Sequence, residues 1–115
     1  FCYKAMCYET SNLIAKKIGL EKGDFTVTFQ SRLDDKWLKP YTDKVMLDLI
    51  ELNKNKVLVA SPAFVSDCLE TLVEISELNK TDFIENGGKK FDLVPSLNYN
   101  DMWVKTIMKI VDDVA

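Results

Sequence analysis

The apolar and polar positions of this chain alternate between helical and extended patterns. Apolar residues recur at helical spacing over residues 6–18, 42–52, 66–84 and 102–114, and glycines stand where the first and third of these segments end. Between them lie short runs rich in β-branched, aromatic and aliphatic residues at 25–29, 56–60 and 91–94. The pattern therefore predicts four helices and three strands.

Helices that alternate with short apolar strands are typical of parallel β-α-β units. We expect an α/β fold with three layers, in which a parallel sheet carries helices on both faces, like half of a flavodoxin-like or Rossmann-like protein. The 115 residues are enough for one domain, residues 1–115, with a hydrophobic core. The chain begins with Phe1 rather than Met, so we expect it to be a piece of a longer protein.

The amino-acid composition argues against several classes of function. The 15 basic and 18 acidic residues give a net charge of −3, which argues against a nucleic-acid partner because phosphate backbones require a basic surface. No apolar run approaches the roughly 20 residues of a membrane span. Histidine is absent, so the chain by itself contains no Ser-His-Asp machinery.

Three cysteines, Cys2, Cys7 and Cys68, are too few for a disulfide scaffold, and we expect a reducing, cytoplasmic location. Cys2 and Cys7 have no second pair to complete a tetrahedral metal site. We interpret them as plain thiols and expect no iron–sulfur cluster, which would need cysteines from a segment outside this chain.

Candidate chemistry gathers where the predicted strands end, since ligands of parallel sheets bind at the carboxyl ends of strands. The segment 31–43 carries Trp37, Pro40 and Tyr41, and the turn 61–66 leads into an acidic helix. A flat apolar surface next to a helix that carries carboxylates suits a large, flat, partly apolar ligand with a cationic or metal centre.

The third predicted helix carries a row of acids at spacings of 3, 4 and 3, namely Asp67, Glu70, Glu74 and Glu77. At about 100° per residue they form one stripe on an α-helix. A solvated helix face is the simpler interpretation of such a stripe. However, the stripe has no lysines at i,i+4 spacing, and hard divalent cations favour clusters of oxygen ligands.

Several segments together resemble the bacterial ferrochelatases. They are Thr28–Leu33 and Trp37–Asp43, then Pro62–Leu72 followed by Glu74-Ile75, and finally Gly87-Gly88 and Val94–Asn98. The similarity covers the whole chain and corresponds to about the last third of a ferrochelatase. It implies the C-terminal lobe of a chelatase-like fold, in which two similar α/β lobes enclose a porphyrin. Family members insert Fe²⁺ into the porphyrin, release two protons and form haem. The segment Cys68-Leu69-Glu70 favours the type that uses protoporphyrin.

The resemblance also implies roles for individual residues. Glu70 corresponds to the glutamate that acts at the metal and as proton acceptor. Asp67, Glu74 and Glu77 fall on a path for protons or metal, and Trp37 falls on the porphyrin pocket. Iron is then a substrate, and no organic cofactor is expected.

The implied partners are porphyrin and the missing N-terminal lobe, which carries the family's essential histidine. A peripheral membrane contact is a further expectation, and the piece alone should be inactive. Two alternatives stay open from the residues: another tetrapyrrole chelatase that inserts cobalt or nickel, or a non-catalytic flavodoxin-like binding module.

Overall fold

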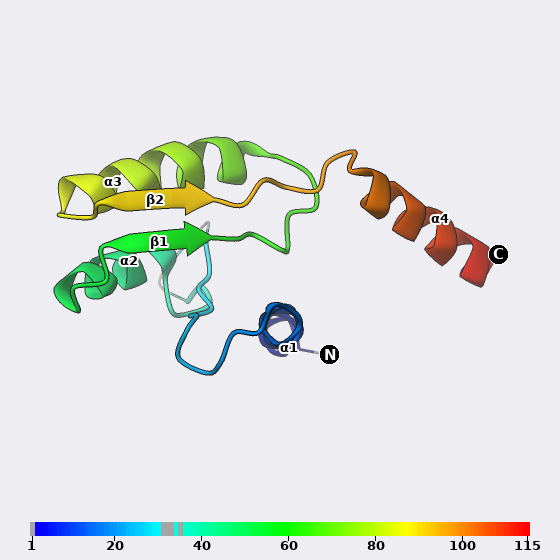
Figure 1. Ribbon diagram of the computed structural model, residues 1–115, viewed down its shortest axis with the longest axis horizontal. Helices are drawn as coiled ribbons and strands as arrows, with labels where there is room; N and C mark the ends of the chain where they lie inside the picture. The colour runs from blue at the N-terminus through cyan, green and yellow to red at the C-terminus, as the bar shows by residue number, and fades with distance from the viewer. Residues whose placement is uncertain (1, 31–33, 35) are drawn as a thin grey trace.

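The computed structural model describes residues 2–30, 34 and 36–115. Seven helices and strands follow one another within these residues (Figure 1): α1 (Tyr3–Ile18), α2 (Thr42–Glu51), β1 (Lys56–Val59), η1 (Glu70–Asn79), α3 (Lys80–Glu85), β2 (Lys90–Leu93) and α4 (Asp101–Val114). The segment η1 is a π-helix that continues directly into α3. Among the described helices, none has both the length and the apolar character needed to cross a membrane.

The two strands are parallel neighbours in one small sheet, with Val57 opposite Phe91 and Val59 opposite Leu93. The connection between them runs through η1 and α3, so the unit is a β-α-β crossover. The predicted α/β class is therefore confirmed, with a smaller sheet than expected.

One face of the sheet carries the core. Met46 of α2, Ile75 of η1, Phe83 of α3 and Phe91 of β2 are buried together, and Val57, Val59 and Leu93 pack against them. The rings of Phe83 and Phe91 lie 6.0 Å apart between centroids. On the other face of β1, Leu58 is 70% exposed. Within the described residues, α2, η1 and α3 thus cover one face of the sheet.

The predicted helices all form, with small shifts at their ends. The first starts at Tyr3 rather than residue 6 and ends as predicted at Gly19, whose φ of 78° is the left-handed conformation that favours glycine. Thr42 is the first residue of α2, as predicted, and Tyr41 occupies the cap position. In α4, the side chain of Asn100 caps the helix by accepting from the backbone N–H groups of Met102 and Trp103.

The predicted strand at 25–29 is wrong. Within the described residues this segment makes only one isolated parallel bridge, between Phe29 and Tyr41. Its bonds run from Phe29 N to Pro40 O at 2.9 Å and from Thr42 N to Phe29 O at 3.4 Å. The residue types favour an extended backbone, but a strand also needs a hydrogen-bonded neighbour along its length.

The predicted helix 66–84 begins later and changes type. The regular helix begins with η1 and continues through α3. The ten residues of η1 are π-helical rather than α-helical. The buried residues of this helix are spaced strictly by four: Thr71, Ile75, Asn79 and Phe83. A π-turn holds more residues than the 3.6 of an α-helix, so this spacing keeps one line of side chains in the core. Of the motif Thr28–Leu33, residues 31–33 lie outside the described residues, as does Phe1.

Candidate functional site

The segments that follow β1 and β2 lie together at the carboxyl end of the sheet. Val94 N donates to Val59 O at 2.8 Å, and Asn98 N donates to Val65 O at 2.9 Å. The start of η1 is therefore tethered to the segment after β2. This is the edge at which parallel α/β sheets bind ligands.

Asp67 is fixed at this edge by Asn98. The backbone N–H of Asp67 donates to Asn98 Oδ1, and Asn98 Nδ2 donates to Asp67 Oδ2, both at 2.8 Å. Thr71 Oγ1 lies 3.1 Å from Asp67 Oδ1. Hydrogen bonds from Asn98, then from Ser96 and Thr71, lower the pKa of Asp67, although the carboxyl group lies in solvent. These hydrogen bonds hold the carboxylate of Asp67 in a defined position just before η1.

Glu70 is the first residue of η1 and is half-buried. Hydrogen bonding from the Cys68 side chain, and then from the backbone N–H of Glu70 itself, lowers the pKa of its carboxyl group. The free N–H groups of a helix start favour the anion in the same direction. A carboxylate in this place can accept a proton or ligate a cation.

Glu74 and Trp37 are joined through one residue, Gln30. Gln30 Nε2 donates to Glu74 Oε2 at 2.9 Å, and Trp37 Nε1 donates to the backbone carbonyl of Gln30 at 2.9 Å. Asn79 Nδ2 completes the set by donating to Gln30 Oε1 at 3.1 Å. The structure therefore brings the predicted tryptophan and one of the predicted acids into a single hydrogen-bonded group.

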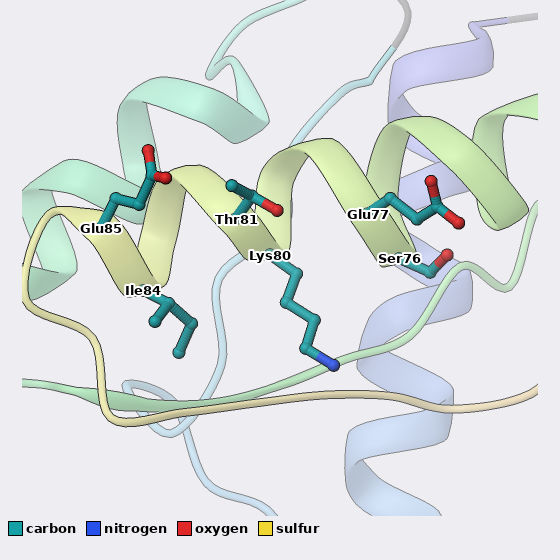
Figure 2. Close-up of a pocket in the computed structure, with 6 residues that line it drawn as sticks. All are labelled: Ser76, Glu77, Lys80, Thr81, Ile84 and Glu85. Atoms are coloured by element: carbon teal, nitrogen blue, oxygen red, sulfur yellow. The ribbon is translucent and has the colours of Figure 1, made fainter.

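Glu77 lies apart from this group. It is exposed and lines a shallow depression along η1 and α3 with Ser76, Lys80, Thr81, Ile84 and Glu85 (Figure 2). The wider turn of a π-helix aligns residues four apart, such as Glu70 and Glu74, and turns Glu77 aside because it follows Glu74 by three. The four acids thus do not form the single stripe that α-helical spacing predicts.

Across the part of the chain that the structure describes, no three His, Cys, Asp or Glu side chains converge closely enough to hold a metal ion. Cys2, Cys7 and Cys68 are free thiols.

Sequence reasoning missed the amides and the hydroxyl that hold the acids. Gln30 and Asn98 belong to the segments that resemble the ferrochelatases, yet neither was given a role. Thr71 and Asn79 are buried polar residues in a helix, at 1% and 7% exposure, and a polar residue on a buried line is a signal in itself. The buried position of these two residues can be inferred from the sequence only when the number of residues per helical turn is known.

Comparison with known proteins gives a consistent result. The family model described as Ferrochelatase matches residues 1–115. A protein named ferrochelatase from Legionella pneumophila (strain Lens) is 43% identical over 113 residues, which are 97% of this chain and 34% of that protein. A ferrochelatase from Coxiella burnetii (strain Dugway 5J108-111) is 46% identical over 110 residues, which are 95% of this chain and 31% of that protein. A ferrochelatase from Stutzerimonas stutzeri (strain A1501) is 44% identical over 110 residues, which are 95% of this chain and 32% of that protein. The chain spans about a third of the length of these relatives. The comparisons favour neither another chelatase nor a non-catalytic module.

Proposed function

Because this chain belongs to the ferrochelatase family, we propose that the full-length protein inserts Fe²⁺ into a porphyrin, forming haem and releasing two protons. The observation that carries the proposal within the site is the place of Glu70 at the start of η1, which Asp67 and Asn98 tether to the segment that follows β2. Metal insertion requires a base for the pyrrole protons, and an ionised carboxylate is a group that can accept a proton.

In this proposal Glu70 accepts a pyrrole proton and contacts the incoming iron. Asp67, Glu74 and Glu77 carry protons or metal between this point and solvent, and Trp37 lines the porphyrin pocket. Trp37 is hydrogen-bonded to Gln30, and Gln30 is hydrogen-bonded to Glu74. This link supports one site that contains both the porphyrin pocket and the path for protons or metal. Glu77 belongs to the outer end of the path, in keeping with its exposure.

We further propose that residues 1–115 form the C-terminal lobe of a two-lobed protein and that the remainder supplies the essential histidine and the other wall of the cleft. The share of the relatives that the chain covers supports a larger protein. The exposed face of the sheet around Leu58 supports a three-layer arrangement in which the remainder covers that face. The proposal includes protoporphyrin as the substrate, no organic cofactor, a cytoplasmic location and a peripheral membrane contact.

The test uses the full-length protein with the substitution Glu70→Gln, which keeps the size of the side chain and removes its charge. Under anaerobic conditions with protoporphyrin and Fe²⁺, we expect haem formation, followed by visible absorption, to fall by about 100-fold or more. Porphyrin affinity should stay within about twofold, because the charge acts on the reaction rather than on the apolar ring.

Glu51→Gln, at the exposed end of α2, is the matched control and should retain normal turnover. Normal turnover by Glu70→Gln would refute the role of this residue. Failure of the wild-type protein to form haem would refute the function itself.

A further inference from the structure

We propose that Gln30 is a positioning residue for iron insertion, which holds the carboxylate of Glu74 in place and connects it to the residue that fixes Trp37. This inference rests on the proposed function and adds a residue for which neither the sequence patterns nor the family resemblance gave a role. Gln30 is the only glutamine in the chain.

Gln30 uses three of its polar atoms on three residues, two in η1 and one in the segment that contains Trp37. Its Nε2 donates to Glu74 Oε2 at 2.9 Å, its Oε1 accepts from Asn79 Nδ2 at 3.1 Å, and its backbone carbonyl accepts from Trp37 Nε1 at 2.9 Å. Glu74 and Asn79 are 44 and 49 residues away in sequence, whereas Trp37 is seven away. One side chain therefore joins the segment before Trp37 to the π-helix.

The orientation of the Gln30 amide is determined by its partners. Buried Asn79 donates from Nδ2 to Gln30 Oε1, which leaves the NH₂ group of Gln30 to donate to Glu74. A carboxylate accepts such a bond and cannot donate one when it is ionised. The arrangement thus holds Glu74 Oε2 in a defined position as the acceptor of a bond from the Gln30 amide.

Side-chain and backbone bonds of Gln30 have separable functions. The side chain acts on Glu74, whereas the bond to Trp37 uses the backbone carbonyl and survives any substitution of the side chain. A change at position 30 should therefore disturb the acidic path and leave the porphyrin contact of Trp37 in place. This predicts an effect on kcat with little effect on porphyrin binding.

The first test is Gln30→Glu in the full-length protein. This variant keeps an oxygen acceptor for Asn79 but replaces the donor to Glu74 with a second carboxylate. We expect kcat for Fe²⁺ insertion to fall about tenfold or more, with KM and Kd for protoporphyrin within about twofold of wild type. Asn86→Asp adds the same charge on the exposed end of α3 and should leave kcat, KM and Kd unchanged. Gln30→Met, which has similar length and no donor, gives a second variant should Gln30→Glu fail to fold.

The second test is the exchange Gln30→Glu/Glu74→Gln. A glutamine at position 74 can donate to a glutamate at position 30. The hydrogen bond is then restored with donor and acceptor exchanged, and the carboxylate stands at position 30 instead of position 74. For a positioning role, we expect the melting temperature to return toward wild type while kcat stays low. Recovery of kcat by the exchange would overturn the proposal, because the hydrogen bond alone would then suffice.

The outcomes separate this proposal from the proposed function. Absence of haem formation by the wild-type full-length protein would refute the function. Normal haem formation by wild type, combined with kcat within about twofold for both Gln30→Glu and Gln30→Met, would refute only the positioning role.

Discussion

At the scale of single residues, hydrogen bonds rather than burial give the direction of the pKa shifts at Asp67 and Glu70. Asp67 and Glu70 both have lowered pKa values, and in both cases the largest cause is a side-chain donor, Asn98 for Asp67 and Cys68 for Glu70. Desolvation acts weakly in the opposite direction at each carboxyl group. The site therefore keeps accessible anions, which is what proton acceptance or cation binding at neutral pH requires.

Removal of the donor should reverse the shift at Asp67. We expect Asn98→Ala to raise the pKa of the Asp67 carboxyl toward its ordinary value. The measurement is the ¹³C chemical shift of the side-chain carboxyl carbon of Asp67 as a function of pH. Because the native pKa is lowered, the stability that this group contributes is present above its unfolded pKa and is lost as pH falls through the folded pKa. The variant should therefore show less of this loss in acid. Asn12→Ala, exposed on α1, is the control, and an unchanged Asp67 titration in Asn98→Ala would contradict the assignment.

The sequence could predict which acids are candidates but not what holds them. Spacing along one helix selected Asp67, Glu70, Glu74 and Glu77 as candidates, since those positions are close in sequence. Their partners Gln30 and Asn98 lie 44 and 31 residues away from the acids that they contact, so only the tertiary fold brings them together. A pattern that extends over a few turns contains no information about such contacts.

At the scale of elements, the period of one helix decides which acids share a face. Expectations for 66–84 assumed 3.6 residues per turn, and on that assumption Glu77 joined Glu70 and Glu74. The buried line Thr71, Ile75 and Asn79 at intervals of four instead follows the wider π-turn. π-helices are rare and lack a distinctive sequence signature, so the apolar pattern located the helix and missed its type. The strand expected at 25–29 failed for a related reason, because residue types do not supply a neighbouring strand.

The turn after α3 is a second element whose sequence requirement becomes clear only in the structure. A Cβ at Gly88 would lie 2.2 Å from Phe83 Cδ1 and 2.7 Å from the Phe83 carbonyl oxygen. Phe83 is fully buried, so its ring has little freedom to move away. The glycine therefore permits the close approach between the chain that leads into β2 and the core ring.

Gly88→Ala should accordingly destabilise the protein by about 1–3 kcal/mol through overpacking, measured by urea unfolding. In a Phe83→Ala background the same substitution should cost less, because Cδ1 and Cε1, the ring atoms nearest the added methyl group, are gone. Gly19→Ala is the control: its cost of about 1–2 kcal/mol comes from the left-handed backbone, with no atom within 4 Å, and should be equal in both backgrounds. Equal costs of Gly88→Ala in the two backgrounds would contradict the steric explanation.

At the scale of the whole molecule, the described residues leave large apolar surfaces uncovered. Leu58 on the open face of β1 is 70% exposed, and Met102 and Val114 of α4 are 78% and 81% exposed. Figure 1 shows α4 extending away from the sheet, and no residue of this helix is buried. The chain covers about a third of its relatives, so we expect the remainder of the protein to pack against these surfaces.

This expectation gives a prediction for the 115-residue chain expressed alone. It should form no haem from protoporphyrin and Fe²⁺, because it contains no histidine and only part of the proposed cleft. It should also bind more of the hydrophobic dye ANS per molecule than the full-length protein does, since Leu58 and the apolar side of α4 are then open to solvent. Co-expression with the remainder of the polypeptide as a separate chain should lower the dye signal and restore haem formation together. Haem formation by the isolated chain at the full-length rate would contradict both the two-lobed arrangement and the need for groups outside these residues, because the catalytic constellation would then be complete within a single lobe.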